Sequence, residues 1–380
     1  MGPLTGLKVV EMAGIGPAPM CAMLLADLGA TVLRVDRLQP SGLGAPVERK
    51  YDVLLRSRPA IALDLKQQPA VDLTLRLIDQ ADAVIEGFRP GVMERLGLGP
   101  DLCRARNPKL VYGRMTGWGQ DGPLAHAAGH DLNYIALTGA LHAIGRKGGP
   151  PTPPLNLVGD FGGGSLYLAF GVMCAVFEAG RTGQGQVVDA AMVDGAASLM
   201  TSYFGHFASG LMTDRRGENM NDSGAYFYDV YECADGLWVS LAPIEQKFHA
   251  ELFQRLEIET SDLPDQWDRS AWDQMKARLA NVFRTKSRAE WQEKLEGTDV
   301  CFAPVLAPNE VAKHPHMAAR QTFIEVDGVT QPAPAPRFSN HPQSTPTPPP
   351  DPSPESAVAA LDGWLPAADA TRLRDDGLFG

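Results

Sequence analysis

The chain has 380 residues, of which 44% are hydrophobic and 21% are charged, proportions that are ordinary for a globular protein with a large core. Its formal net charge of −11 argues against a general nucleic-acid binder, but it is compatible with a local basic pocket for an anionic ligand. The five cysteines are scattered and form no CxxC pair, so we expect reduced thiols in the cytoplasm and no zinc site. The sequence shows neither a secretory signal pattern nor an 18-residue apolar run, and we therefore expect no membrane span.

The first part of the chain alternates short apolar runs with helix-forming segments. This alternation predicts a mostly parallel, Rossmann-like sheet in an α/β domain, covered by helices on both faces. The predicted strands are Lys8–Met12, Thr31–Val35, Ala83–Glu86 and Leu110–Arg114. The predicted helices are Met20–Leu28, which Gly29 would end, Val71–Ala81, and the apolar segment Leu166–Ala179, which is expected to be buried.

A second, smaller α+β unit is predicted to begin near Tyr226. The strand-forming segments Tyr228–Cys233 and Leu237–Leu241 flank the turn Ala234–Gly236, a pattern typical of a hairpin. Two helical segments follow, at Gln246–Leu256 and Ala271–Leu295. After them come a Pro-rich connector at 331–353 and a short helix at Glu355–Trp364. The expected organisation is a large domain (1–190), a linker (191–225) and a small domain (226–320), then a Pro-rich return linker (321–353) and a C-terminal helix with its tail (354–380).

Two Gly-containing segments hold the strongest candidates for chemistry. Gly129-His130-Asp131 offers an imidazole, and Gly159-Asp160 offers a carboxylate. Both can act as acid or base, because imidazole titrates near neutral pH and burial can raise the pKa of a carboxyl group. Two bases on separate segments suit a reaction that removes a proton from one face of a carbon and returns one on the other. The alternative interpretation is a core histidine and a turn or helix-capping aspartate.

Two further patterns favour ordinary structure over a cofactor or metal site. Gly14–Pro19 follows a predicted strand and Asp36 closes the next one, as in a dinucleotide-binding fingerprint, but Pro19 replaces the third glycine. We interpret this segment as a tight strand-to-helix turn. His126 and His130 have the spacing of a helical metal pair, but a glycine lies between them and no HExxH glutamate accompanies them. No metal and no redox cofactor are therefore predicted.

In combination, these and several other segments resemble the α-methylacyl-CoA racemases, which belong to the larger family III CoA-transferase group. The resemblance runs from about Leu4 to Phe338 and includes Glu86–Val92, Met115–Pro123, Ala128–Tyr134, Asn156–Gly164, Ala190–Gly195, Tyr231–Gly236 and Pro334–Phe338. It implies an acyl-CoA substrate, a place in lipid and fatty-acid metabolism, and an interlocked homodimer with its active site between the large and the small domain.

The resemblance also implies roles for individual residues. His130 and Asp160 would exchange a proton with the substrate from opposite faces, and Glu245 would orient His130. If Asp131 opens a helix, its backbone N–H would face the thioester oxygen and favour negative charge there. CoA is part of the substrate, so no separate cofactor is expected. The residues expected to contact it are Arg37, Leu63, Asp64, Leu65, Lys66, Gly87, Phe88, Arg89, Pro90, Gly91, Val92, Arg95, Gly129, Leu132, Asn133 and Tyr134.

The alternative is a family III CoA transferase in which Asp131 accepts the acyl group. Asp131 matches the aspartate of the transferases' Gly-aromatic-Asp motif, but His130 occupies the aromatic position, as it does in the racemases. This difference favours proton transfer over acyl transfer. A third possibility is a non-catalytic CoA-binding protein, which would bind acyl-CoA without exchanging its α-hydrogen.

Overall fold

The computed structural model describes residues 2–39, 42, 44–261 and 263–379, which fall into two compact units. Unit 1 consists of the residues up to Thr138, Leu155–Leu199 and the residues from Ala318 onward; unit 2 consists of Gly139–Pro154 and Met200–Met317. This division differs from the expected one: residues 139–154 belong to unit 2, while residues 191–199 and the Pro-rich return segment belong to unit 1.

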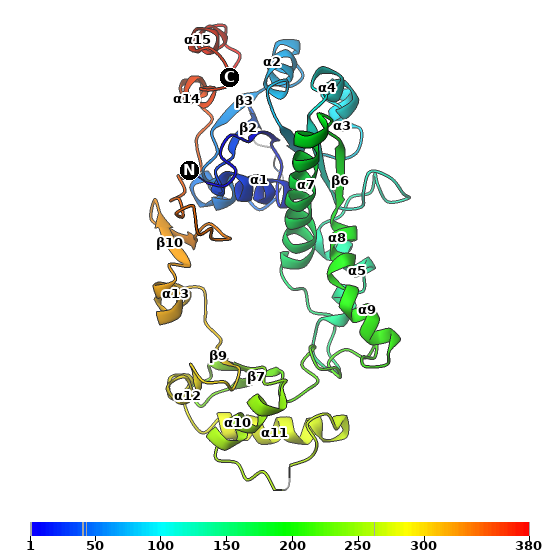
Figure 1. The fold of residues 1–380 in the computed structure, drawn as a ribbon, viewed down its shortest axis with the longest axis vertical. Helices are drawn as coiled ribbons and strands as arrows, with labels where there is room; N and C mark the ends of the chain where they lie inside the picture. Colours follow the sequence, from blue (N-terminus) through cyan, green and yellow to red (C-terminus); the bar gives the residue numbers. More distant parts are fainter. Residues whose placement is uncertain (1, 40–41, 43, 262, 380) are drawn as a thin grey trace. The chain divides into compact units, whose positions relative to one another are not determined.

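Unit 1 is built on a six-stranded parallel sheet, in agreement with the predicted mostly parallel α/β architecture (Figure 1). The strand order is β3-β2-β1-β4-β5-β6, so the order reverses between β1 and β4. The strands are β1 (Lys8–Met12), β2 (Thr31–Arg37), β3 (Ala60–Leu63), β4 (Ala83–Glu86), β5 (Val111–Thr116) and β6 (Val187–Ala191). β3 and β6 were not predicted, because segments of four or five small and mostly apolar residues fit strand and helix equally well.

Helices cover both faces of this sheet, and the two faces have separate cores. Successive side chains of a strand point to opposite faces. Accordingly, Val9 packs in one core with α1 (Pro17–Asp27) and α7 (Leu166–Thr182), while Val10 packs in the other with α2 (Gln68–Ile78). The C-terminal helices α14 (Pro354–Ala360) and α15 (Ala367–Asp375) also contribute to the α2 core. The remaining helices of unit 1 are α3 (Val92–Arg95), α4 (Pro100–Arg106), α5 (Asp131–Leu137) and α8 (Met192–Leu199), with short turns at η1 (Arg49–Tyr51) and η2 (Val53–Leu55).

The turn before α1 is the tight strand-to-helix turn expected from Gly14–Pro19. Gly16 is the N-cap, with a φ of 68° that strongly favours glycine, and Pro17 opens the helix, three residues before the predicted start at Met20. Proline is well suited to the first helical position because its missing N–H would have no partner there. Gly29 follows the end of the helix with a φ of 99°, as expected.

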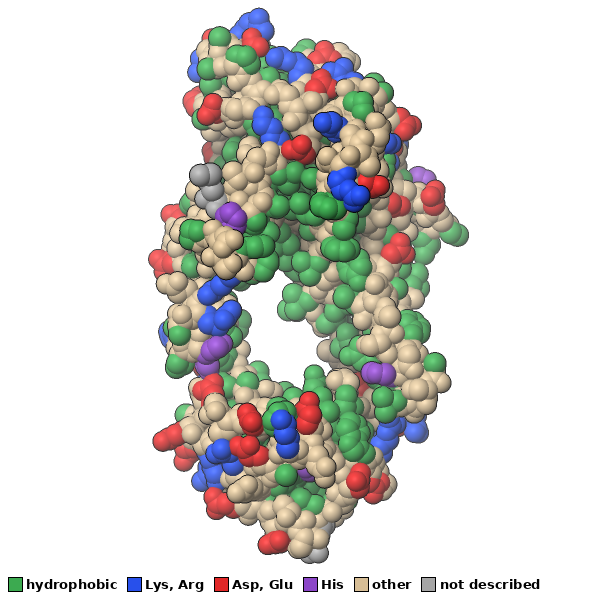
Figure 2. Space-filling view, in the orientation of Figure 1, with side chains coloured by type: hydrophobic (Ala, Val, Ile, Leu, Met, Phe, Trp, Pro, Cys, Tyr) green, Lys and Arg blue, Asp and Glu red, His purple; other side chains and the backbone are tan. Residues whose placement is uncertain are grey.

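The prediction that the helix at 166–179 is buried is wrong for half of its surface. The π-helical segment η3 (Leu157–Ser165) runs directly into α7, and α7 packs on β5, β6 and α1. On the opposite side Phe170 is 71% exposed and Phe177 is 69% exposed. Within the described residues, 157–182 is the one helix long and apolar enough to cross a membrane, but core helices of other proteins pass the same test. Exposed hydrophobic side chains are visible on unit 1 (Figure 2).

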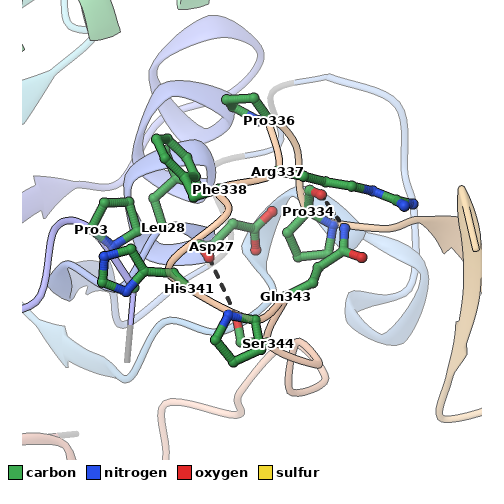
Figure 3. A pocket seen from close by; sticks show the side chains of 12 residues that line it. Pro3, Asp27, Leu28, Pro334, Pro336, Arg337, Phe338, His341, Gln343 and Ser344 are labelled. Carbon is green, nitrogen blue, oxygen red and sulfur yellow. Dashed lines mark hydrogen bonds between the residues drawn. The ribbon is translucent and has the colours of Figure 1, made fainter. Parts of the chain in front are cut away.

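The return segment ties the end of the chain to its beginning. The hairpin β10 (Phe323–Val326) and β11 (Val329–Pro332) precedes it, so the first residues of the predicted Pro-rich connector belong to a strand. Arg56 forms a 2.5 Å ion pair with Asp27 at the end of α1 and donates to the side chain of Gln331 at 2.9 Å. Ser344 donates to the Asp27 carbonyl oxygen at 3.4 Å, at the edge of a small pocket that Phe338 also lines (Figure 3).

Unit 2 has its own aromatic core around a three-stranded antiparallel sheet. The predicted hairpin is present as β7 (Asp229–Glu232) and β8 (Trp238–Leu241), and β9 (Phe302–Pro304) adds a third strand. The predicted helical stretch 271–295 is not continuous, because Ser287 and Glu290 form a capping box that starts a new helix. The helices are α6 (Ala140–Ala143), α9 (Thr201–Ala208), α10 (Gln246–Arg255), α11 (Trp272–Phe283) and α12 (Arg288–Leu295), with short turns η4 (Arg269–Ala271) and η5 (Val311–Lys313). α13 (Pro315–Ala319) spans the boundary between the units.

Candidate active site

The two Gly-containing motifs come together in unit 1, where α5 packs against η3. Asp131 is the first residue of α5 and is 6% exposed. Its Oδ2 accepts hydrogen bonds from the backbone N–H groups of Gly159 at 2.7 Å and Asp160 at 2.8 Å. A Cβ on Gly159 would overlap this carboxylate, at 2.9 Å from its Cγ, so the contact requires glycine. The sequence had indicated both motifs, and the structure joins them through these two hydrogen bonds.

His130 is exposed at the start of α5, and its backbone is fixed on both sides. The Asn133 side chain accepts from the His130 N–H at 3.0 Å, while the His130 carbonyl accepts from the Asn133 N–H at 2.8 Å. Just before it, the Gly129 carbonyl accepts from the hydroxyl of Tyr134, whose ring packs edge-on against Trp118. A Cβ on Gly129 would lie 2.8 Å from the Tyr134 ring, so the turn is shaped for glycine. The imidazole is thus held at a defined point while remaining accessible.

Asp160 is half-buried among groups that affect its charge. Burial raises the pKa of its carboxyl group, and the negative charge of Asp131 acts in the same direction. The Asn156 amide donates to Oδ2 at 3.1 Å and opposes this shift, as does the neighbouring His130. Gly16 lies on the other side, where a Cβ would be 3.3 Å from Oδ2. A carboxyl group with a raised pKa and a nearby imidazole forms a suitable pair of proton donors and acceptors.

A cavity of about 340 Å³ lies at the carboxyl ends of β1, β2 and β4, in the same unit. Gly14 follows β1, Arg37 ends β2, and Gly87 with Phe88 follows β4. Open parallel sheets bind ligands at this position, where the strand order reverses. Three residues expected to contact CoA, namely Arg37, Gly87 and Phe88, therefore line one cavity.

Some of the charged side chains that line this cavity already form ion pairs, and one of them does not. Arg34 and Arg49 both form ion pairs with Asp36 and, although burial acts in the opposite direction, they hold the pKa of that carboxyl group below its usual range. Arg37 instead lies over the Phe88 ring, with its Cζ 5.6 Å from the ring centroid, and makes no ion pair with the residues that the structure describes. Its guanidinium is therefore free to bind an anionic group.

The loop after β4 is anchored by a buried carboxyl group. Glu86 accepts from the Phe88 N–H at 2.7 Å and pairs with Arg114 at 2.9 Å, and burial raises its pKa to about 7. The expected CoA-contacting residues of this loop continue through Arg89, Pro90, Gly91 and Val92, with Gly91 as the N-cap of α3 at a φ of 81°. Arg89 is exposed, and it lies close enough to Tyr134 for its charge to oppose the rise that burial causes in the pKa of the Tyr134 phenol.

Other expected CoA-contacting residues lie outside this cavity. Leu63 is 2% exposed and belongs to the hydrophobic core, so its side chain is not available to a ligand. Asp64 accepts from the Lys66 N–H at 3.1 Å in the turn that contains Leu65. The side chains of Lys66, Arg95, Leu132 and Asn133 are exposed, whereas Tyr134 is buried.

Glu245 belongs to unit 2, where it is the N-cap of α10. The amide of buried Gln266 donates to the carbonyl groups of Pro243 at 3.1 Å and Ile244 at 2.9 Å, and so fixes the backbone before Glu245. The proposed contact of Glu245 with His130 stays a prediction.

Sequence reasoning missed two residues that shape the site, Asn156 and Gly16. Asn156 lies four residues before Asp160, a spacing that brings side chains together on a helix, and this spacing was a usable signal. Gly16 comes from a distant turn, and only the folded structure places it beside the Asp160 carboxylate.

Residues 4–356 match the model of CoA-transferase family III, and the chain belongs to this family. The chain is 44% identical to α-methylacyl-CoA racemase of Mus musculus over 341 residues, which cover 89% of this chain and 87% of the mouse protein. It is also 44% identical to the Homo sapiens α-methylacyl-CoA racemase over 342 residues, with the same coverage of both chains. The crystal structure of a CAIB/BAIF family protein from Brucella suis superposes with a TM-score of 0.80 at 26% identity, covering 95% of this chain and 99% of that one.

Proposed function

We propose that this protein is an α-methylacyl-CoA racemase that interconverts (R)- and (S)-2-methylacyl-CoA thioesters. The 44% identity to two proteins of that name over most of both chains supports this function. The observation that carries it is local: the accessible His130 lies close enough to the half-buried Asp160 to oppose the rise in the pKa of that carboxyl group, next to a helix start that favours negative charge.

The reaction needs two proton carriers and stabilisation of an enolate. The thioester carbonyl acidifies the neighbouring C–H bond. One of His130 and Asp160 removes this proton, and the other delivers a proton to the opposite face; their roles exchange with the direction of reaction. The backbone N–H groups at the start of α5 would lower the energy of the enolate oxygen. No bond to the protein forms, and CoA stays attached to the acyl group throughout.

The environment of Asp131 favours racemisation over the transferase alternative. A nucleophilic carboxylate must reach the acyl carbonyl, but Asp131 is 6% exposed and its Oδ2 is engaged by two backbone N–H groups. His130 and Asp160 are both more accessible than Asp131. Proton transfer through the accessible pair therefore fits the geometry better than an anhydride at Asp131.

The CoA moiety would occupy the cavity at the carboxyl ends of β1, β2 and β4. Arg37 offers a free guanidinium there, and Arg89 extends the cationic surface toward Tyr134. Arginine suits phosphate because its planar head donates several hydrogen bonds at once. This arrangement would leave the acyl thioester to reach His130 and Asp160.

A homodimer and a cytoplasmic location complete the proposal. The apolar side of α7, with Phe170 and Phe177, is the kind of surface that a second copy would cover. All five cysteines are free, which fits a reducing compartment. A 2-methylacyl-CoA substrate would place the enzyme in the metabolism of branched fatty acids.

The direct test is incubation of one enantiomer of a 2-methylacyl-CoA with the purified protein in deuterated water. Mass spectrometry should show one deuteron gained, and chiral analysis should show the other enantiomer, without any acceptor acid. A transferase would leave the α-hydrogen in place and would move CoA only once an acceptor acid is added, and a simple binding protein would bind the thioester unchanged.

A further inference from the structure

We infer that Asp131 is a positioning residue whose carboxylate caps, from a separate segment of the chain, the helix that carries Asp160. The inference rests on the proposed role of Asp160 as a base and assigns a physical function to a carboxyl group that the reaction itself does not consume.

The N-terminus of the helix formed by η3 and α7 lacks a cap of its own. η3 begins with the i→i−5 hydrogen bonds of a π-helix: the Phe161 N–H donates to the Asn156 carbonyl oxygen at 3.3 Å, so the N–H groups that precede it have no partner within the helix. The N-cap residue Asn156 makes no side-chain capping hydrogen bond. Asp131 supplies the missing acceptor, because its Oδ2 binds the N–H groups of Gly159 and Asp160 at 2.7 and 2.8 Å. Hydrogen bonds to an ionised carboxylate are shorter and stronger than those between neutral groups.

This remote cap leaves Asn156 free for a different contact. Its amide donates to Oδ2 of Asp160 at 3.1 Å. The candidate base is thus held at two points: Asp131 fixes its backbone, and Asn156 orients its carboxylate.

The burial of Asp131 is costly without such a role. A buried carboxylate is unfavourable unless hydrogen bonds compensate it, and the Oδ1 of Asp131 is buried without a partner among the described residues. The two N–H groups and the positive end of the helix are what compensate the charge. Gly159 is part of the same arrangement, because a Cβ there would force the carboxylate away.

The charged groups around Asp160 determine how a substitution at Asp131 changes the pKa of Asp160. Of the elements packed against η3, α5 contributes Asp131, Tyr134 and the preceding His130. The charged groups of the other elements packed against η3, namely α1, α7, α8 and β6, are not among those acting on Asp160; they are Asp27, Glu178, Arg181, Asp194 and Asp189. Because Asp131 raises the pKa of Asp160 and Asn156 lowers it, their removal shifts that pKa in opposite directions.

Three variants separate the cap from the charge. Asp131→Ala removes both the acceptor and the charge, Asp131→Asn removes the charge but keeps an acceptor oxygen, and Gly159→Ala displaces the carboxylate without altering it. We expect Asp131→Ala and Gly159→Ala to lower kcat by about ten- to a hundredfold with little change in KM, because a displaced base reacts slowly with a substrate that is still bound. Asp131→Asn should keep more activity than Asp131→Ala. His126→Ala, at an exposed histidine outside the site, is the control.

Two readouts distinguish positioning from general stability. Hydrogen exchange of the peptide spanning 156–165 should speed up in Asp131→Ala and Gly159→Ala but not in the control, and this measurement does not depend on activity. In the direction that uses Asp160 as the base, activity falls as the pH drops through the Asp160 pKa. Asp131→Asn should move this acid limb to lower pH, and Asn156→Ala should move it to higher pH.

The outcomes separate this inference from the proposed function. Wild-type protein without α-proton exchange would overturn the proposed function, whatever the hydrogen-exchange result at 156–165. The role of Asp131 would be overturned if the wild-type protein exchanges the α-proton but the variants keep its kcat, its acid limb and its hydrogen-exchange protection of residues 156–165. If Asp131→Ala does not fold, Asp131→Asn and Gly159→Ala decide the question by the same readouts.

Discussion

At the scale of single residues, the neighbours of Asp160 determine whether it is usable as a base. Burial and Asp131 raise its pKa, whereas Asn156 and His130 oppose that shift. A base with a pKa closer to the working pH than an ordinary carboxyl group also becomes a better acid, as a reversible proton transfer requires.

His130→Ala should reduce α-proton exchange from the enantiomer that His130 deprotonates by about 10²- to 10⁴-fold, the usual contribution of a general base. The fold should be unaffected, because His130 is exposed and its backbone contacts to Asn133 do not involve the imidazole. Exchange followed by mass spectrometry and a thermal melt measure the two effects. Near-normal turnover in the folded variant would remove His130 from the mechanism.

At the scale of elements, close approach of backbones brings the site together. η3 crosses α8 where Gly163 meets Gly195, and η3 also contacts α1 and α5. The sequence predicted four of the six parallel strands and the hairpin of unit 2, and it singled out the two Gly-containing motifs that the structure brings together, because these signals are local. It did not predict that Asp131 caps a helix beginning at Leu157, since such a contact depends on how α5 packs against η3. Asp131 is itself the first residue of α5, but the helix whose N–H groups its side chain binds is a different one.

Gly195→Ala should destabilise unit 1 by about 1–3 kcal/mol, because a Cβ at this position would overlap the Gly163 backbone and force α8 away from η3. The matched control is Gly180→Ala in α7, where a Cβ meets nothing within 4 Å. That change should be neutral or stabilising by up to about 1 kcal/mol. Urea unfolding of both variants measures the difference; equal stabilities would show that the helix crossing tolerates a methyl group.

Arg37→Ala should weaken acyl-CoA binding about tenfold, since a hydrogen bond to a charged group contributes about 1.5–3 kcal/mol. The rate of the bound chemistry should change little, because the phosphates lie far from the reacting carbon. Arg106→Ala is a suitable control: it removes a cation whose partner is Asp79 on the outer surface. Calorimetric titration with a non-reacting acyl-CoA measures the affinity of each variant. Equal affinities of the two variants would place the phosphates elsewhere.

At the scale of the whole molecule, unit 1 leaves an apolar surface exposed. Phe170 and Phe177 lie on the exposed side of α7, although the sequence of this helix is apolar on nearly all sides. A helix that is hydrophobic all round is normally buried. The side of α7 that carries Phe170 and Phe177 is therefore where we expect a second copy of the chain to pack.

The double variant Phe170→Glu with Phe177→Glu should shift the protein toward monomer, because two charges would have to be buried at the interface. Leu102→Glu, at an exposed position of α4, should leave the assembly unchanged. Sedimentation velocity over a range of concentrations distinguishes the two results. A wild-type protein that is monomeric throughout would remove the dimer from the account.

The central claim is that two bases serve opposite faces of the substrate, and single-turnover exchange with Asp160→Asn tests it most directly. Asparagine keeps the shape of the side chain but removes its basic oxygen. Each enantiomer of a 2-methylacyl-CoA is mixed with the variant in deuterated water, and deuterium content and configuration are followed separately. We predict that one enantiomer still exchanges its α-hydrogen through His130, while the other exchanges slowly and interconversion falls by about 10²-fold or more. Equal, near-normal exchange and racemisation from both enantiomers would contradict the two-base account.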